Sequence, residues 1–255
     1  MCSSDLRDSA AIAPFICATL TRSPLHQGVF VAISACGAGL VLHRLVGSWL
    51  PGAFSNADER LTAAVIWAPF ALVFTMNVAL RAALVLPIEV RANWIFRLTE
   101  DQATRAEELN IVVRAAILLG VVLPVAVLFP VEWAVLGPQA IHCTSMAFLC
   151  GLVLVELHMA EWRRIPFTCS YAPTTQFVGL TLLMGVTAFV VFTMIGSRLV
   201  RYSVNHRVGW LAAMTILGAV VVYLRRQRLW LSEGATLMFE DLLPNEVEPL
   251  QLSEY

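Results

Sequence analysis

The side chains best suited to chemistry in this chain are a few polar groups set within long apolar runs. Glu156 lies near the carboxyl end of one run, with His158 and Glu161 just beyond it, and Asn77 lies deep within another. Polar groups at such positions bind ions or substrates, or join neighbouring helices by hydrogen bonds. For Glu156 we favour an interfacial structural role over a proton or substrate site, with His158 and Glu161 paired on one helical face. For Asn77 we favour a hydrogen bond between helices.

The segment Leu86–Asn110 is the longest polar interruption in the chain and a second candidate site. Its Trp94 can lie in the membrane interface while Arg91 and Arg97 face water, the pattern of a short amphipathic segment. Such a segment is either a connector that lies on the membrane surface, which we favour, or a docking element for a cytoplasmic ATP-hydrolysing subunit, as in ATP-driven exporters. A capping-box pattern predicts that a helix begins near Glu100.

Histidines and cysteines offer two weaker candidates. His43, His142 and His206 fall towards the same predicted membrane face, and two such histidines on adjacent helices could ligate a b-type haem. We favour a role for them as polar anchors at the interface. Cys169 lies in a predicted cytoplasmic loop without a neighbouring base to activate its thiol, so we expect it to be inert.

Several signatures of enzymes and metal sites are missing from the sequence. It contains none of the motifs H-E-x-x-H, G-x-S-x-G or G-x-x-x-x-G-K-[ST], which mark zinc proteases, serine hydrolases and nucleotide-binding loops. Its 6 cysteines form no C-x-x-C pair, so neither a zinc site nor a disulfide framework is expected. We therefore expect a protein without catalytic activity, cofactor or metal of its own.

The composition is that of a protein embedded in a membrane. Hydrophobic residues make up 58% of the 255 residues, charged residues make up 14%, and the mean hydropathy is +0.75. Soluble domains have roughly 45–50% apolar and about 25% charged residues. We therefore predict an all-α, polytopic transmembrane helix bundle in contact with the lipid bilayer. The formal net charge of −1 provides no basic field to attract nucleic acid.

Six apolar runs are long enough to cross a bilayer, which takes about 20 residues each. They are Gly28–Leu50, Leu61–Leu80, Ile111–Phe129, Pro138–His158, Gln176–Gly196 and Arg207–Leu224. We expect the second span to continue past Arg81, and the stretch Glu132–Gly137 to form a tight turn. The amphipathic segment Leu86–Asn110 then joins the second span to the third on the cytoplasmic side.

Small residues recur at a spacing of four along the first span. They are Gly28, Ala32 and Cys36, and again Ala35 and Gly39. This spacing allows a neighbouring helix to approach closely, so we expect a close helix contact along this face.

The chain divides into three predicted parts. Residues 1–27 combine MCSSDL, which matches the translation of a common sequencing-adapter end, with Ala10–Leu20, an apolar stretch too short to span the membrane. We expect that stretch to lie on the membrane surface and the native chain to begin upstream of the artefact. Residues 28–224 form the six-span bundle. Residues 225–255, with 6 acids and no base after Arg228, form an acidic cytoplasmic tail.

The distribution of arginine predicts the orientation in the membrane. With six spans, both termini share one side of the membrane. Of the 17 arginines, 12 would lie on that side: Arg7, Arg22, Arg81, Arg91, Arg97, Arg105, Arg114, Arg163, Arg164, Arg225, Arg226 and Arg228. The other 5 are Arg44, Arg60, Arg198, Arg201 and Arg207. Because cytoplasmic loops carry the basic excess, we predict that both ends are cytoplasmic.

Four stretches resemble segments of uncharacterised bacterial multi-pass inner-membrane proteins. They are Thr19–Gln27, Ala92–Glu100, Ile165–Pro173 and Leu237–Glu254. The resemblance implies that the chain is the C-terminal half of a longer bacterial inner-membrane protein, whose missing N-terminal half would be a partner of the bundle. It implies no particular activity and no functional residues.

These features favour a transport-associated, permease-like membrane subunit. A separate cytoplasmic ATPase would be its partner, because the chain itself has no nucleotide-binding motif. The alternative is a non-transporting membrane protein that acts in interaction or sensing. A b-haem or quinol redox subunit is a third and weaker alternative.

Overall fold

The protein is built from helices. The computed structural model describes residues 16–49, 57–86, 105–160 and 178–233. Its elements are α2 (Pro24–Trp49), α3 (Ala57–Val85), α5 (Arg105–Ile117), η2 (Leu118–Val122), α6 (Leu123–Leu136), η3 (Gly137–Gln139), α7 (Ala140–Met159), α8 (Val178–Asn205) and α9 (Arg207–Glu233). Residues 16–22 are also helical. No strand occurs in these ranges, and the predicted all-α fold is confirmed.

Five segments of the described chain are long and apolar enough to cross a membrane: Pro24–Ser48, Asp58–Val85, Leu109–Met159, Gly179–Val204 and Val208–Leu231. The segment Leu109–Met159 has 51 residues, more than twice the length that one crossing needs. It reverses at Gly137, whose φ of 56° lies in the left-handed region that favours glycine. One of its arms is the α5–η2–α6 rod and the other is α7. The described residues therefore form six helical rods of membrane length, the number that the sequence predicts: α2, α3, α5–η2–α6, α7, α8 and α9.

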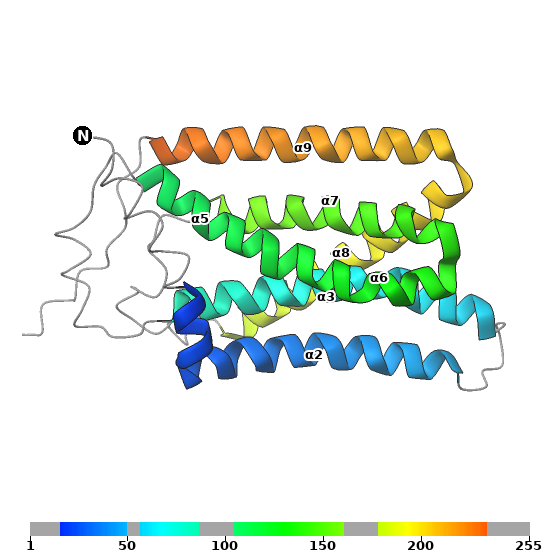
Figure 1. Ribbon diagram of the computed structural model, residues 1–255, viewed down its shortest axis with the longest axis horizontal. Coiled ribbons are helices and arrows are strands. Elements are labelled where there is room, and N and C mark those ends of the chain that lie inside the picture. Colours follow the sequence, from blue (N-terminus) through cyan, green and yellow to red (C-terminus); the bar gives the residue numbers. More distant parts are fainter. Residues whose placement is uncertain (1–15, 50–56, 87–104, 161–177, 234–255) are drawn as a thin grey trace, which may run out of the picture.

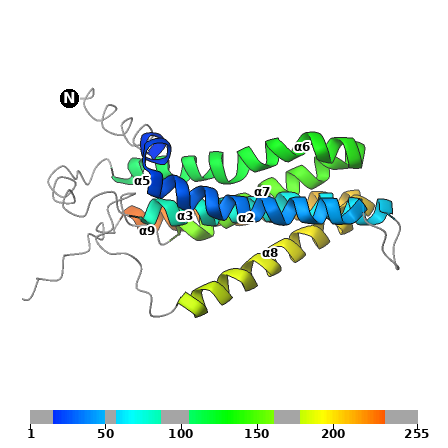
Figure 2. The same ribbon diagram turned by 90° about the horizontal axis from the view of Figure 1, so that it is seen from below.

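Successive rods run in opposite directions (Figure 1). α2, the α5–η2–α6 rod and α8 begin at one end of the bundle, and α3, α7 and α9 return to it (Figures 1 and 2). We call this end the terminal end, and the end that holds Gly137 the hairpin end. The first and last described residues therefore lie at the same end of the bundle, as an even number of rods requires.

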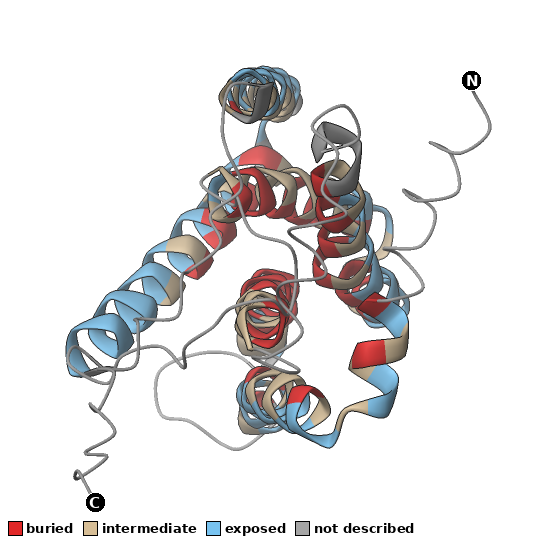
Figure 3. Cartoon of the chain, turned by 90° about the vertical axis from the view of Figure 1, so that its left-hand side faces the viewer, coloured by how far each residue is buried: buried red, intermediate tan, exposed pale blue. Residues whose placement is uncertain are grey.

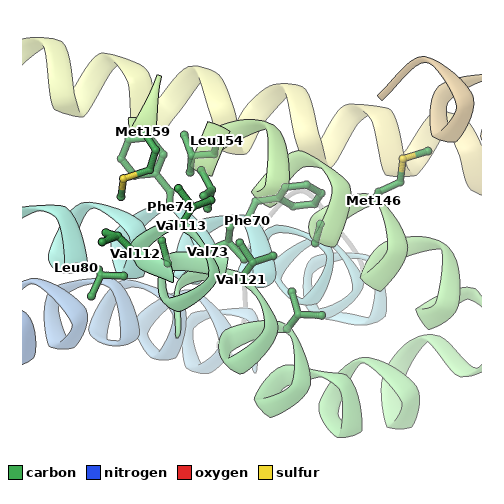
Figure 4. Packing of buried hydrophobic residues seen from close by; sticks show 14 of the residues in the cluster. Phe70, Val73, Phe74, Leu80, Val112, Val113, Val121, Met146, Leu154 and Met159 are labelled. Carbon is green, nitrogen blue, oxygen red and sulfur yellow. The ribbon is translucent and has the colours of Figure 1, made fainter. Parts of the chain in front are cut away.

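α3 is the central helix. In its most apolar stretch 67% of the residues are buried, against 11% in α2 and α8 and 0% in α9. A helix with apolar side chains on all faces is the kind that other helices surround. Its Phe70, Val73 and Phe74 form the main core cluster together with Val121 of η2 and Met146 of α7 (Figure 4). Seen along the bundle, buried residues gather on inward-facing helix surfaces and exposed residues on outward-facing ones (Figure 3).

The prediction that the small residues of the first span form a close helix contact is wrong, because the face that carries them is exposed. Ala32, Ala35 and Cys36 are exposed, and a Cβ added to Gly28 or Gly39 would meet nothing within 4 Å. The neighbouring Gly37 is the buried one, and a Cβ on it would collide with the side chain of Thr75 on α3. Spacing alone shows that a face carries small residues, but not whether a helix lies against it.

The predicted turn at Glu132–Gly137 is also wrong. α6 continues to Leu136, and the reversal is confined to the short 3₁₀ turn η3. The predicted span ended at Phe129, directly before Pro130, whereas in the structure Pro130 lies inside α6. Glu132 instead lies on α6 and faces the interior.

Several helices extend beyond the apolar runs. α3 continues past Arg81, as predicted. α8 runs on to Asn205, so Arg198 and Arg201 lie on a helix rather than in the expected loop. α9 continues to Glu233, into the stretch assigned to the acidic tail. Hydropathy identifies the part of a helix that suits lipid, whereas backbone hydrogen bonds allow the helix to continue beyond the apolar run.

Candidate functional site

The α5–η2–α6 rod is interrupted inside the bundle. Residues Leu118–Val122 form the π-helix η2. Pro124 follows, and because proline has no N–H it cannot donate to the carbonyl of Gly120 four residues earlier. Asn77 of α3 supplies a donor: its Nδ2 donates to the Gly120 carbonyl at 2.9 Å and to the Val73 carbonyl at 2.8 Å. Asn77 therefore joins α3 to the interrupted rod.

This contact requires a glycine in the π-helix. A Cβ added to Gly120 would lie 2.7 Å from Asn77 Oδ1, closer than real Cβ contacts allow. Asn77 is 3% exposed, so its amide depends on protein partners rather than on water. Single π-turns inside α-helices occur often at functional sites. The interruption is thus a candidate for a functional element of the interior.

A buried ion pair links three helices near the terminal end. Arg228 Nε donates to Glu156 Oε2 at 2.8 Å, and Arg228 Nη1 donates to Asn110 Oδ1 at 3.1 Å. The side chains of Arg228 and Glu156 are 7% and 4% exposed, so each charge depends on the other for stabilisation. The structure therefore places Glu156 in an ion pair that joins α7 to α9, and Asn110 extends it to α5.

His158 contacts neighbours other than Glu161, which lies outside the described residues. Its Nδ1 donates to the Leu154 carbonyl at 3.1 Å, which fixes the proton on that nitrogen. Its own carbonyl accepts a hydrogen bond from Arg81 Nη1 of α3 at 2.6 Å. The imidazole packs against the ring of Phe74, with 6.4 Å between centroids. These contacts hold α7 against α3.

Glu132 lies between α6 and α7, towards the hairpin end. It is 1% exposed and is the most buried of the acidic residues whose burial the structure describes. Thr144 Oγ1 donates to Glu132 Oε2 at 2.6 Å, whereas the buried Oε1 has no hydrogen-bond partner among the described residues. The adjacent Cys143 is fully buried, and its thiol donates to the carbonyl of Ile66 on α3 at 3.9 Å. Unlike Glu156, this carboxyl group has no cationic partner in the described part of the chain.

Sequence reasoning missed Glu132 because it assigned the residue to a turn. Helical periodicity contained the signal: Pro124, Leu128 and Glu132 follow at intervals of four and share one helical face. The structure shows all three buried. A carboxyl group that continues an apolar helical face is a candidate functional group in a membrane bundle.

The three histidines considered for haem ligation make separate contacts. His142 of α7 packs against the ring of Trp210 on α9, with 4.9 Å between centroids, and His206 packs against Tyr202 at 5.1 Å. His43 of α2 lines a surface cleft. Within the described ranges no ring contact joins two of them, and no group of three or more His, Cys, Asp or Glu residues there could hold a metal ion.

The cleft that contains His43 lies at the hairpin end between α2, α3 and α8. Its volume is about 480 Å³, and Arg44, Arg60, Trp67 and Phe189 are among its lining residues. The guanidinium of Arg44 lies over the ring of Trp67, 5.2 Å from the centroid, in a cation–π contact. Trp67 and Phe189 pack edge to face at 6.0 Å. Arginine and tryptophan are both suited to a membrane interface, where an apolar stem or ring lies in lipid and the polar group reaches water.

The predicted candidate residues therefore do not form one site. Asn77, Glu156 and His158 take part in three separate contacts between helices. The remaining candidates lie outside the described residues: Arg91, Trp94, Arg97 and Cys169. The predicted amphipathic segment lies there as well, except at its two ends, and stays a prediction.

The polar contacts of the described interior include the Glu156–Arg228 pair towards the terminal end, the Asn77–Gly120 contact at the π-helix, and Glu132 with Thr144 towards the hairpin end. They offer hydrogen bonding and ionisable groups, but no group of three or more His, Cys, Asp or Glu residues among the described residues could hold a metal ion. Comparison of the chain with protein-family models, with curated proteins and with solved structures gave no match.

Proposed function

We propose that this chain is a transport-associated, permease-like membrane subunit. The observation that supports the proposal most is the interrupted α5–η2–α6 rod, whose Gly120 carbonyl is bonded by a side chain of the central helix. Membrane transporters often form their binding sites at discontinuous helices, because a backbone carbonyl that has lost its helical hydrogen bond can bind a ligand there. In this bundle the side-chain amide of Asn77 donates a hydrogen bond to that carbonyl.

A separate cytoplasmic ATPase is the proposed source of energy. The chain has no P-loop motif of its own, so ATP-driven movement would need a second protein. We place the terminal end of the bundle on the cytoplasmic side of a bacterial inner membrane. The arginine excess supports that placement, because 12 of the 17 arginines belong to segments expected at the side of the two termini.

Affinity purification tests the ATPase partnership. The tagged full-length chain is purified from its own membranes after mild cross-linking, and the eluate is assayed for ATP hydrolysis and for co-purified proteins. An ATPase enriched over an unrelated tagged multi-span protein from the same membranes is the expected result. The absence of such an enrichment would overturn the proposed partnership.

A pair of glycine variants tests the role of the interruption. Gly120→Ala should preserve co-purification of the ATPase but lower the hydrolysis rate of the complex, because the added Cβ crowds Asn77 at the π-helix. Gly39→Ala is the matched control, since its Cβ would meet nothing within 4 Å. Equal hydrolysis rates in the two variants would remove the interruption from the mechanism.

A non-transporting interaction or sensor protein is the second candidate. It is favoured by α8, which diverges from the bundle towards the terminal end (Figure 2) and exposes all of residues 179–188. An exposed apolar helix face of this kind suits contact with another membrane helix as well as with lipid. Co-purification of a membrane protein without any ATPase would favour this candidate over transport.

A further inference from the structure

Glu132 is a carboxyl group in an apolar helix contact. It lies on the buried face of α6 that also carries Pro124 and Leu128, and only 1% of its surface is exposed. An ionised carboxylate at such a position has lost its water shell and needs cations or several hydrogen-bond donors in compensation. The energetic state of this side chain therefore depends on which groups surround it.

The surroundings supply much less than an ionised carboxylate requires. The neutral hydroxyl of Thr144 donates to Oε2, and the thiol of Cys143, a weak donor, is also beside the carboxyl group. Within normal hydrogen-bonding distance, the buried Oε1 has no partner among the described residues. Glu156 provides the contrast within the same bundle, because a guanidinium group contacts it at 2.8 Å. A proton on Glu132 would remove the uncompensated charge. We infer that Glu132 is a proton-binding site of the membrane bundle, at which the carboxylate takes up one proton to give a neutral carboxylic acid and releases it to restore the carboxylate.

The groups around Glu132 favour a proton over a metal cation. The side-chain oxygens that the described contacts bring together here are the two of the carboxyl group and the hydroxyl oxygen of Thr144. A hard cation such as Ca²⁺ takes six to eight oxygen ligands, roughly twice as many or more. The neighbouring side chain on α7 is the thiol of Cys143, which donates towards the carbonyl of Ile66 on α3. The site therefore fits a ligand that needs only one or two oxygens.

The histidine and the charged side chains near this end of the bundle are directed away from Glu132. On α7, the ring of His142 packs against Trp210 of α9. On α3, Asp58 and Glu59 are exposed, and Arg60 lines the cleft that α3 shares with α2 and α8. Among the described residues that pack against α6, none of these groups forms an ion pair with Glu132. The ionisable group beside the carboxyl group is the thiol of Cys143 on α7, a neutral hydrogen-bond donor. The proton would therefore bind to Glu132 itself, because no charged side chain is paired with it in this part of the structure.

Glu132 lies near the hairpin end of its helix, which is the side from which water would exchange this proton. Glu132 precedes the reversal at Gly137 by five residues, which is about 8 Å along a helix axis. Glu132 is also on the same rod as the π-helix η2. Uptake of the proton would thus change the charge on the rod that the proposed transport function uses. The coupling to transport rests on that proposed function, whereas proton binding itself does not.

Infrared difference spectroscopy tests proton binding directly. The purified full-length chain in lipid nanodiscs is measured over a pH series and compared with Glu132→Gln and, as the matched control, Glu156→Gln. We expect a carbonyl-stretch band of a buried carboxylic acid that gives way to carboxylate bands as the pH rises. The band should be lost in Glu132→Gln and kept in Glu156→Gln. A spectrum without this band at any pH, or a band that persists in Glu132→Gln, would overturn the inference.

A second variant keeps Glu132 in place and tests the geometry. Thr144→Val removes the hydroxyl that donates to Oε2 at 2.6 Å, so the carbonyl band of Glu132 should move to higher frequency. No movement would contradict the assignment of the band to this site. Replacing choline by sodium at constant pH should leave the band unchanged, and its loss in sodium would show a metal-cation site instead. ATPase co-purification is measured separately, so the proposed function and the proton site can fail independently.

Discussion

The buried pair of Arg228 and Glu156 should make single and double substitutions behave in opposite ways. Glu156→Leu leaves the guanidinium without its partner, and Arg228→Met leaves the carboxylate without its own. Both side chains are less than a tenth exposed, so water cannot replace the lost contact. Removing one partner of a buried pair costs about 3–5 kcal/mol. Replacing both partners by apolar residues of similar volume is neutral or stabilises by about 1–4 kcal/mol.

Thermal unfolding followed by tryptophan fluorescence in nanodiscs measures the difference. For a chain of this size each kcal/mol changes Tm by about 2–4 °C. Each single variant should therefore unfold about 6–20 °C below the unchanged protein on that scale. The double variant Glu156→Leu with Arg228→Met should unfold at or above the temperature of the unchanged protein. The sign of the change is thus expected to reverse between the single and double variants.

Arg226→Leu is the control for this experiment. Arg226 is exposed two residues before Arg228 on the same helix, and a surface substitution there should change stability by less than about 0.5 kcal/mol. An Arg228→Met variant that is no more destabilised than Arg226→Leu would refute the stabilising role of the ion pair. A double variant that loses the summed stability of both single variants would refute it too, because the two effects would then be independent of each other.

Substitutions at three other positions should also have measurable effects. Gly120→Ala should lower stability by about 1–3 kcal/mol, because its Cβ would lie 2.7 Å from Asn77 Oδ1, and thermal unfolding checks this. Gly196→Ala on α8 should also lower Tm, because its Cβ would collide with a buried phenylalanine ring of α3, whereas Gly185→Ala on the same helix meets nothing within 4 Å and should not. A cysteine placed at Ala103 should react with a membrane-impermeant maleimide only after cells are permeabilised, and labelling of intact cells would place that segment outside.

The sequence was sufficient for the class of fold because the hydrophobic effect acts on composition and run length. A run of about 20 apolar residues is stable in a bilayer only as a helix, whose backbone groups bond to one another. This rule predicted the all-α bundle and the number of membrane-length rods. It could not predict where helices end, so Arg198 and Arg201 were expected in a loop rather than on α8.

The polar groups of the interior also show what the sequence could identify and what only the structure could. Sequence identified Glu156 and Asn77 as unusual, because polar groups in apolar runs are costly in lipid. It could not identify the guanidinium of Arg228 as a partner, since 72 residues separate the two charges along the chain. It also could not find the bond from Asn77 to the carbonyl of Gly120, which exists only because α3 passes beside the π-helix.

The sequence by itself therefore determined that the chain forms membrane-length helices and which of their residues carry charge. Only the tertiary structure decided which helix lies at the centre, because almost every face of these helices is apolar and any of them could have been covered. The same packing decided that Glu156 is paired with a guanidinium group while Glu132, within the described part of the chain, has no cationic partner and keeps one oxygen without a hydrogen bond. Burial and pairing are properties of neighbouring helices in space, and neither is contained in the hydropathy of a single run.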